Sequence, residues 1–348
     1  MIDQTRSPLP PRPHKRRARY SGKYPRRFEE KYKEHDPARY AETVAKVLSS
    51  GKTPAGMHRP IMVSEVLEAL APQPGELAVD CTLGFGGHAQ ELLARIQPGG
   101  RLLGLDSDPI ELPRSEARLR GLGFGPEVFM VRRRNFAGLP QALWETEIKS
   151  ADIVLADLGV SSMQLDDPGR GFSMKNEGPL DMRMNPQRGQ PASALLAGIR
   201  TEALQVLLEE NADEPHATLL APALAGKLFA STTALARAVR AVLPRLNKEA
   251  GDDAIRRVFQ ALRVAVNDEF SALETFLRQL PACLNPGGRA AVLSFHSGED
   301  RRVKKAFAAG LHAGLYAAIS GVLRAGMEER RANPRSTPAK LRWARRAV

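Results

Sequence analysis

The sequence predicts an α/β protein with a parallel, doubly wound sheet that a mostly helical insertion interrupts. Three observations predict this fold class. Short apolar runs, most of them closing on an acidic residue, alternate with helical patterns over residues 77–157. The alternation then stops, and residues 165–275 hold a Gly, Pro and Met-rich loop followed by helical patterns. A last buried strand is expected at 289–296, so the α/β domain resumes after the insertion.

The predicted strands follow one another with helices between them. A helix at 65–70 precedes the first strand, and a helix at 89–96 follows it. Strands are expected at 77–80, 101–106, 128–131 and 152–157. The first, second and fourth end in Asp80, Asp106 and Asp157. Because ligands collect at the carboxyl ends of parallel strands, these acids are candidate site residues.

The chain divides into five predicted segments. In order they are a basic, partly disordered N-terminal extension (1–55), the first part of the α/β domain (56–164), the helical insertion (165–275), the second part of the domain (276–320) and a basic C-terminal tail (321–348). The extension begins as a basic, Pro-rich arm and contains a short predicted helix at 38–50.

Positive charge is concentrated at the two ends of the chain. The 348 residues include 51 Lys and Arg against 39 Asp and Glu, a formal net charge of +12. Residues 1–33 hold 11 basic and 3 acidic residues, residues 321–348 hold 8 and 2, and the stretch between them carries −2. Basic arms bind phosphate non-specifically, so the ends favour a nucleic-acid partner, whereas the body must recognise its substrate by local placement of charge.

Composition also excludes several classes of protein. Only two cysteines occur, Cys81 and Cys283, so neither a disulfide framework nor a cysteine-rich metal site can form. No run of 18 apolar residues is present, and the start of the sequence lacks the apolar core of a signal peptide. We therefore expect a cytoplasmic protein with no membrane partner. The spacing of the His and acidic residues predicts no metal site.

A glycine-rich loop follows the first predicted strand. Gly84-Phe85-Gly86-Gly87 allows backbone amides to approach a ligand at the start of a helix. Read as Gly84-x-Gly86-x-x-Ala89, with Asp106 about 20 residues further on, the loop fits the dinucleotide fingerprint. The same residues suit a nucleoside with an amino-acid tail, the ribose on Asp106 and the tail on the loop. Nicotinamide dinucleotide and S-adenosylmethionine therefore both remain open at this point.

The stretch after the fourth strand is rich in polar residues. Residues 157–166 offer Asp, Gly, Ser and Gln but no nucleophile paired with a base, which suits positioning rather than covalent chemistry. Residues 169–184 then form a long loop of unusual composition, and such loops are usually functional or disordered. Two features remain open: Arg132-Arg133-Arg134 is either a solvated edge or a phosphate contact, and His296 either packs or faces the substrate.

Several motifs, in one order, resemble the RsmH (MraW) family of 16S ribosomal RNA methyltransferases. They are Asp80-Cys81-Thr82-Leu83-Gly84-Phe85-Gly86-Gly87-His88, Asp157-Leu158-Gly159-Val160-Ser161-Ser162, Gln164-Leu165-Asp166, Arg170-Gly171-Phe172-Ser173, Gly178-Pro179-Leu180-Asp181-Met182-Arg183-Met184, Phe259-Gln260-Ala261-Leu262-Arg263, Ser294-Phe295-His296-Ser297 and Asn333-Pro334-Arg335. The resemblance spans about residues 58–343 and leaves 1–55 outside it.

The resemblance implies a class I S-adenosylmethionine-dependent methyltransferase fold with an inserted helical domain that recognises the substrate. It implies transfer of a methyl group from S-adenosyl-L-methionine to N4 of a cytosine in the decoding centre of 16S ribosomal RNA, with the small ribosomal subunit as partner and no role for DNA. Carried over position by position, it implies the cofactor residues Gly86, Gly87, His88, Asp106, Phe136, Asp157 and Gln164. Among these, Gly86, Gly87 and His88 would contact the methionine end, Asp106 the ribose, and Phe136 the adenine.

A cytosine amine is a poor nucleophile because its lone pair is delocalised into the ring. A carboxylate or carbonyl that accepts a hydrogen bond from the amine would repolarise it, and Asp157 is the candidate catalytic residue. The target base should be unstacked into the site. Two alternatives stay open: a nicotinamide-dependent oxidoreductase, and a catalytically impaired relative that only binds RNA.

The sequence departs from the family pattern at three places, one of which is the apolar stretch around 219–228, where the family usually has a basic helix. Residues 211–215 read Asn-Ala-Asp-Glu-Pro where the family usually has a Gly-Glu-Glu segment. The family's His-Ser-Leu-Glu-Asp-Arg appears here as residues 296–301 with Gly298 in place of leucine. The motifs that imply cofactor contacts are intact.

Overall fold

The computed structural model describes residues 60–348. The predicted extension at 1–55, with its helix at 38–50, lies outside the described residues. Over the described part, no helix combines the length and apolar character needed to cross a lipid bilayer.

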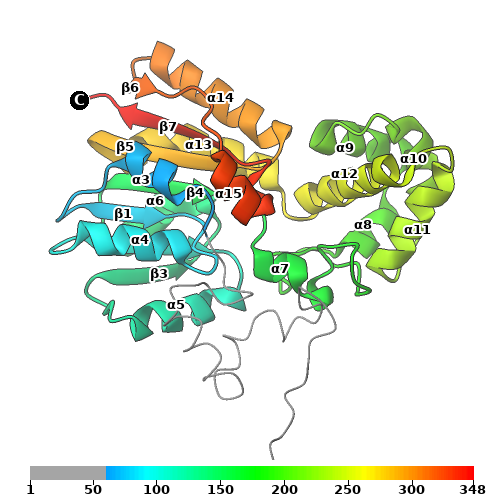
Figure 1. Cartoon of the computed structure of the whole chain (residues 1–348), viewed down its shortest axis with the longest axis horizontal. Coiled ribbons are helices and arrows are strands. Elements are labelled where there is room, and N and C mark those ends of the chain that lie inside the picture. The colour runs from blue at the N-terminus through cyan, green and yellow to red at the C-terminus, as the bar shows by residue number, and fades with distance from the viewer. Residues whose placement is uncertain (1–59) are drawn as a thin grey trace, which may run out of the picture. The chain divides into compact units, whose positions relative to one another are not determined.

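One sheet of seven strands organises the structure (Figure 1). The strands are β1 (Leu77–Asp80), β2 (Arg101–Asp106), β3 (Phe129–Arg133), β4 (Ala151–Asp157), β5 (Leu284–Ser294), β6 (Tyr316–Ile319) and β7 (Lys340–Arg346). Their order is β3-β2-β1-β4-β5-β7-β6; strands β1 to β5 are parallel, and β7 is antiparallel to both its neighbours. The predicted doubly wound sheet, with a strand at each expected place, is confirmed.

Residues along each central strand point alternately to the two faces of the sheet, as the period of two requires. Val79 and Val154 belong to one hydrophobic cluster, and Ala78 and Ile153 to another. The first cluster is covered by α6 (Leu139–Glu145), α13 (Glu269–Cys283) and α14 (Ser297–His312). The second is covered by α3 (Val63–Leu70), α4 (Gly87–Ile96) and α5 (Glu111–Gly121). Helices therefore pack on both faces, which explains why the central strands are apolar throughout.

The insertion has a hydrophobic core of its own. Its helices are α8 (Ala192–Gly198), α9 (Thr201–Ala212), α10 (Ala217–Leu224), α11 (Thr232–Val242) and α12 (Lys248–Val266), and they gather beside the sheet in Figure 1. On α12, Ile255, Val258 and Leu262 recur at helical spacing and are fully buried in this core. The short helix α7 (Ser162–Asp166) leads into the insertion.

The insertion ends earlier than the sequence predicts. The predicted boundary at residue 275 falls inside α13, whose Leu273, Phe276 and Leu277 pack in the cluster on the sheet. In a sequence, two adjoining helical patterns do not show which hydrophobic core each helix joins. In the structure the boundary lies near Asn267, between α12 and α13.

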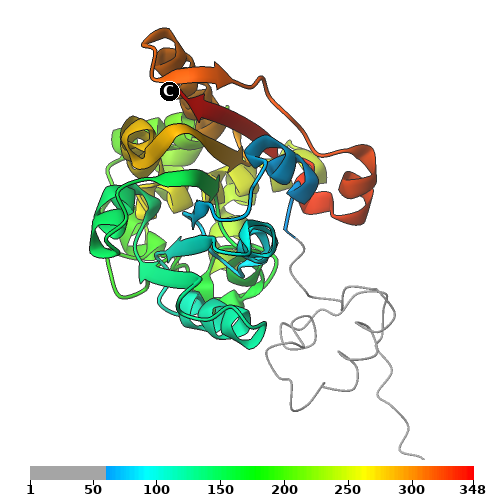
Figure 2. The same ribbon diagram turned by 90° about the vertical axis from the view of Figure 1, so that its left-hand side faces the viewer.

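The prediction of a basic tail at 321–348 is wrong for residues 340–346. Residues 340–346 form β7, which pairs with β5 through six consecutive residues and with β6 on its other side (Figures 1 and 2). Leu341 and Ala344 are fully buried in the sheet, whereas Arg342 and Lys340 bond the carboxylate of Asp300 on α14. The cations between the apolar residues hid the strand pattern in the sequence. Upstream of β7, the tail holds a further short helix, α15 (Met327–Ala332).

Candidate cofactor and substrate site

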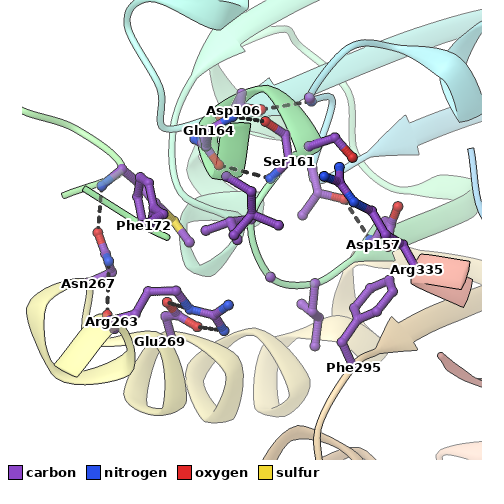
Figure 3. Close-up of a pocket in the computed structure, with 18 of the residues that line it drawn as sticks. Asp106, Asp157, Ser161, Gln164, Phe172, Arg263, Asn267, Glu269, Phe295 and Arg335 are labelled. Carbon is purple, nitrogen blue, oxygen red and sulfur yellow. Dashed lines mark hydrogen bonds and ion pairs between the residues drawn. The ribbon is translucent and has the colours of Figure 1, made fainter. Parts of the chain in front are cut away.

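A cavity of about 880 Å³ opens at the carboxyl ends of β1, β2 and β4, beside β5 (Figure 3). All seven predicted cofactor residues line it: Gly86, Gly87, His88, Asp106, Phe136, Asp157 and Gln164. The strand order reverses between β1 and β4, and the crevice at such a reversal is where open α/β sheets bind ligands. The insertion contributes the facing wall through α12.

The glycine loop needs its glycines for conformation and for space. Gly86 has φ +80° and precedes α4, and a Cβ there would lie 3.0 Å from Leu119 Cδ1. At Gly87, a Cβ would lie 3.0 Å from the ring of Pro60. Arg118 donates hydrogen bonds to the carbonyls of Phe85 and Gly86, at 3.0 and 2.9 Å. With its carbonyls held from behind, the loop presents the start of a helix to the cavity.

Asp106 at the end of β2 is fixed by backbone amides. Its carboxylate accepts hydrogen bonds from Gly84 N at 2.8 Å and Asp108 N at 2.9 Å. Burial raises the pKa of Asp106 to about 6, although these hydrogen bonds oppose the shift. Burial likewise raises the pKa of Asp80, at the end of β1, to about 6. Both carboxyl groups therefore lack a full counter-charge within the described chain.

Asp157 at the end of β4 faces His88 in the first turn of α4. The His88 Nε2 and Asp157 Oδ2 atoms are 3.6 Å apart, and His88 is 7% exposed. Burial disfavours the imidazolium, but the nearby carboxylate of Asp157 outweighs that effect, and the pKa of His88 is raised. Within residues 60–348, the buried Asp157 Oδ1 has no hydrogen-bond partner. This oxygen is therefore available to accept a hydrogen bond from a bound molecule.

The charge of the cavity floor distinguishes between the two candidate cofactors. Asp80, Asp106 and Asp157 put three carboxyl groups around one loop, with His88 as the nearest partial counter-charge. The pyrophosphate of a nicotinamide dinucleotide would add negative charge to this floor. S-adenosylmethionine instead brings a sulfonium and an ammonium, which stabilise ionised carboxylates. The floor favours S-adenosylmethionine.

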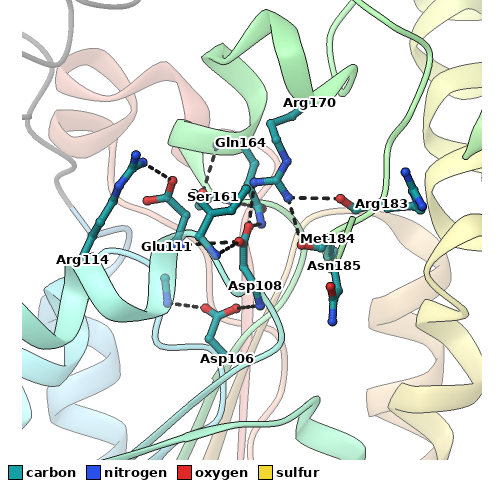
Figure 4. A network of polar contacts seen from close by, with 12 residues as sticks. Asp106, Asp108, Glu111, Arg114, Ser161, Gln164, Arg170, Arg183, Met184 and Asn185 are labelled. Atoms are coloured by element: carbon teal, nitrogen blue, oxygen red, sulfur yellow. Dashed lines mark hydrogen bonds and ion pairs between the residues drawn. The ribbon is translucent and has the colours of Figure 1, made fainter. Parts of the chain in front are cut away.

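Gln164 lines the cavity, yet its amide is already engaged (Figure 4). Its Oε1 accepts from Ser161 N at 2.9 Å in a capping box, and its Nε2 donates to Asp108 Oδ2 at 2.7 Å. Arg170 Nη1 donates to the same Asp108 oxygen at 2.8 Å, and its Nη2 donates to Met184 O at 2.9 Å. Gln164 thus fixes the loop after β4 to the end of β2.

Asp108 was not among the predicted site residues. It is fully buried and joins the end of β2 to Gln164 and Arg170, 56 and 62 residues further along the chain. Its only signal was its place two residues after Asp106, next to a predicted strand end. The partners Gln164 and Arg170 both stood in quoted motifs, so the motifs marked a structural network as well as a binding site.

The wall opposite the glycine loop comes from the junction of α12 and α13 (Figure 3). Arg263 donates two hydrogen bonds of 2.9 Å to the carboxylate of Glu269. Phe172 from the long loop is 6% exposed, and Phe295 follows β5; both line the same cavity. Arg263 lay in a quoted motif, but nothing in the sequence paired it with Glu269.

His296 also lines the cavity. Its Nε2 lies 3.2 Å from Glu299 Oε1, and its ring lies 5.6 Å from that of Phe270. Glu269, His296 and Glu299 bring donor atoms within 4.8 Å of one another, a grouping that could hold a metal ion and that the sequence did not predict. Arg263 already bonds Glu269, so the positive charge that these acids need is supplied by the chain itself.

Two of the three departures from the family pattern, residues 211–215 and Gly298, lie near each other in space. Asp213, at the end of α9, accepts a hydrogen bond from the Ser297 hydroxyl at 2.6 Å and pairs with Arg301 at 3.0 Å. The same turn of α14 contains Gly298, where a Cβ would lie 2.5 Å from Phe270 Cζ. Asp213 therefore contacts the turn of α14 that contains Gly298, and neither Asp213 nor Gly298 lines the cavity.

A cavity with an acidic floor, placed at the reversal point of a sheet whose last strand is antiparallel, defines an S-adenosylmethionine-dependent methyltransferase of class I. The chain belongs to the MraW methylase family, whose model matches residues 55–347. It is 48% identical to "Ribosomal RNA small subunit methyltransferase H 2" of Alkaliphilus metalliredigens, covering 95% of this chain and 97% of that one. It is 46% identical to "Ribosomal RNA small subunit methyltransferase H 1" of Lachnoclostridium phytofermentans, covering 96% and 93%.

These relatives correct one expectation about the N-terminal extension. Their alignments leave 5% and 4% of this chain unmatched, which is fewer residues than the 55 of the extension. The expectation that residues 1–55 lie outside the resemblance is therefore wrong for these two relatives. Among solved structures, an S-adenosylmethionine-dependent O-methyltransferase from Thermotoga maritima is 10% identical with a TM-score of 0.40, over 88% of this chain and 71% of that one, a likeness too distant to bear on function.

Proposed function

We propose that this protein transfers a methyl group from S-adenosylmethionine to N4 of a cytosine in the decoding centre of 16S ribosomal RNA, in the cytoplasm and on the small ribosomal subunit. Relatives named as small-subunit ribosomal RNA methyltransferases support the substrate class. The observation that carries the reaction is Asp157, whose buried Oδ1 has no partner among residues 60–348 and lies beside the glycine loop. An exocyclic amine needs such an acceptor.

The cavity residues fit the cofactor. Gly86 and Gly87 would hold the methionine end at the start of α4, Asp106 would accept hydrogen bonds from the ribose hydroxyls, and Phe136 would border the adenine. Phe136 is held for this by an edge-on contact with Phe276, with ring centres 5.6 Å apart. When bound, S-adenosylmethionine supplies an electrophilic methyl group on its sulfonium.

Asp157 and His88 would act on the amine. A hydrogen bond from the amine to Asp157 Oδ1 draws the lone pair out of the cytosine ring, which makes the nitrogen a better nucleophile. His88 Nε2 lies 3.6 Å from Oδ2, the other oxygen of the same carboxylate, which leaves Oδ1 to accept that bond. The aromatic side chains of Phe172 and Phe295 offer stacking surfaces for a base that has left its helix.

The structure weighs against both alternatives. An acidic floor disfavours the pyrophosphate of a nicotinamide dinucleotide. The departures from the family pattern, at 211–215, around 219–228 and at Gly298, all lie outside the cavity, so they leave the predicted cofactor residues in place. An impaired relative would be expected to have lost residues in the cavity itself.

The test is methyl transfer to small ribosomal subunits from a strain that lacks its own enzyme of this family, with the product mapped by mass spectrometry. We expect one N4-methylcytosine in the decoding centre, and we expect subunits from the parent strain to accept none. Transfer to another atom or another nucleotide, or no transfer while S-adenosylmethionine still binds, would overturn the proposal.

A further inference from the structure

A second cavity, of about 640 Å³, adjoins the first. The two cavities share lining residues: Ser107, Arg134, Asn135, Met184 and Asn267. One side of the second cavity is the end of β3 and the residues after it. The other side is the long loop around residues 183–189 and the end of α12. A molecule that occupies the first cavity and continues beyond it therefore has a second cavity beside it.

Arginines dominate this second cavity. Five line it, Arg132, Arg133, Arg134, Arg183 and Arg188, against the two acids Glu145 and Asp268. Two of the five are already paired: Arg134 with Glu145, and Arg183 with Asp181 at 2.7 Å. We call this lining the arginine cleft. Its charge is local, because the body of the chain, residues 34–320, carries a net charge of only −2.

Three of these arginines form no ion pair within residues 60–348, although the pKa of Glu145 is lowered by Arg134 and, more weakly, by Arg132. Arg132 donates to the carbonyl of its neighbour Val131 at 2.8 Å and has no ion pair within residues 60–348. Arg133 and Arg188 are exposed, and neither side chain has a hydrogen bond or an ion pair with another described residue. Structural arginines are normally engaged by carboxylates or carbonyls, so free guanidinium groups around a cavity indicate a site for an anion.

We propose that the arginine cleft binds the sugar-phosphate backbone of the substrate RNA next to the target cytosine; this rests on the proposed function. A base in the first cavity stays joined to its neighbours in the strand, so their phosphates must pass close to the cavity mouth. The planar guanidinium group matches a phosphate with two parallel hydrogen bonds. The cleft has one wall from β3 and one from the insertion, so the same RNA segment contacts both parts. The arginine run 132–134 is then a phosphate contact.

The experiment removes the two free, exposed charges with the variant Arg133→Gln/Arg188→Gln. Binding to a transcribed decoding-centre fragment of 16S ribosomal RNA is followed by fluorescence anisotropy between about 50 and 300 mM KCl, because RNA affinity falls with salt for every phosphate that the protein neutralises. Each lost phosphate contact lowers the slope of log K against log salt by about 0.7 to 0.9, so we expect a reduction of about 1.4 to 1.8. Affinity for S-adenosylmethionine, measured by calorimetry, stays within about twofold because neither arginine lines the first cavity.

The matched control is Arg101→Gln/Arg278→Gln. It removes the same charge from two exposed arginines, one at the start of β2 and one on α13, and neither lines either of the two cavities described above. We expect this variant to keep the wild-type slope. If it lowers the slope as much as the cleft variant does, or if the cleft variant keeps the wild-type slope, the proposal is wrong.

Two further outcomes separate this proposal from the proposed function. If the wild type methylates no small subunit but the slope still depends on Arg133 and Arg188, the proposed function fails and the cleft stands. If transfer proceeds with an unchanged slope in the cleft variant, the cleft alone fails. If the cleft variant loses binding to the assembled subunit but keeps binding to the naked RNA fragment, the cleft contacts a ribosomal protein. That result would overturn the proposal.

Discussion

Two neighbouring cavities share a wall and carry opposite charge. The first has the carboxyl groups of Asp80, Asp106 and Asp157 around its glycine loop, and the second has guanidinium groups along its walls. A cationic cofactor can therefore bind in the first cavity while an anionic strand of RNA binds in the second, a short distance away. The net charge of +12 cannot do this, since it describes the whole chain and is concentrated at the ends.

The acidic groups and the arginines are brought together by different parts of the fold. The three acids close parallel strands, so the sheet topology alone brings them to one edge. The arginines come from the residues after β3 and from a loop of the insertion, and they meet only because the insertion packs where it does. The cofactor site thus depends on the fold, and the arginine cleft depends on how the two cores are joined.

The largest effect is expected for Asp157→Asn, which removes the charge of the carboxylate beside His88. We expect kcat for methyl transfer to fall by roughly 100-fold or more, the range of a lost proton-transfer or hydrogen-bonding group. KM for the RNA should stay within about threefold, because the change leaves the arginine cleft untouched. Single-turnover transfer gives the rate and anisotropy gives RNA binding.

Asp252→Asn is the control for that substitution, since Asp252 pairs with Arg240 on the surface of the insertion. It should leave kcat unchanged. A normal kcat in Asp157→Asn would show that a group other than Asp157 polarises the amine. The acidic floor of the first cavity would then have no part in the methyl transfer itself.

Salt should affect the two cavities differently. If three free arginines each contact one phosphate, a fourfold rise in salt weakens RNA binding by about 20- to 40-fold. Affinity for S-adenosylmethionine should change by less than about threefold, because a buried pairing is screened little. Anisotropy and calorimetry at the same two salt concentrations test this. Equal salt sensitivity of the two ligands would contradict the contrast.

Acid should weaken cofactor binding. The pKa values of Asp80 and Asp106 are raised to about 6 by burial, so below pH 6 both groups become protonated and lose their attraction for a cation. We expect affinity for S-adenosylmethionine to fall by about tenfold per pH unit below 6 for each carboxyl that must ionise. Calorimetry from pH 7.5 to pH 5 measures it, and a flat profile would mean that the acids do not contact the cofactor's charge.

The unliganded protein should respond to pH in the opposite sense. A raised pKa means that the folded state holds these protons more tightly than the unfolded state does. The contribution to stability is present below the ordinary value of 3.8 and is lost as the pH rises through about 6. The increase in Tm on adding S-adenosylmethionine should therefore be larger at pH 7.5 than at pH 5, as thermal denaturation with and without cofactor will show.

The smallest effect is expected for Asp213→Asn, which breaks the ion pair with Arg301 between the insertion and α14. Both side chains are about half exposed, so the pair should contribute less than about 1 kcal/mol to the free energy of unfolding. Denaturant unfolding of both single variants and the double variant gives the coupling energy. Methyl transfer should stay within about twofold; a large loss would mean that this contact sets the geometry of both cavities.

The fold could be predicted where the sequence signal is local. Strands β1 and β2 were predicted at their observed bounds, because apolar runs that end in an acid are bounded by turns. Residues 340–346 could not be recognised as a strand, because Arg342, Arg345 and Arg346 make the segment basic while Leu341 and Ala344 alone carry its buried face. The partner that neutralises Arg342, Asp300, is 42 residues away in the sequence.

The site could be predicted as far as the motifs reach. All seven residues that the family resemblance implied for the cofactor line one cavity. The resemblance did not show that the Gln164 amide hydrogen-bonds Ser161 and Asp108, nor that Arg263 pairs with Glu269. The arginine cleft was visible only as the run 132–134, because Arg188 comes to it from 54 residues further along the chain. Contacts between segments that belong to separate hydrophobic cores leave no local pattern in the sequence, so they could not be predicted from it.

The position of β7 has a consequence for how the protein is made. In the sheet, β7 lies between β5 and β6, although it follows both in the chain. During synthesis, β5 leaves one edge unpaired until residues 340–346 arrive, and β6 cannot join the sheet before them. An open apolar strand edge is a site of aggregation. The nascent chain therefore depends on rapid arrival of its last strand, and a ribosome that pauses after residue 294 would prolong exposure of the strand that flanks the catalytic cavity.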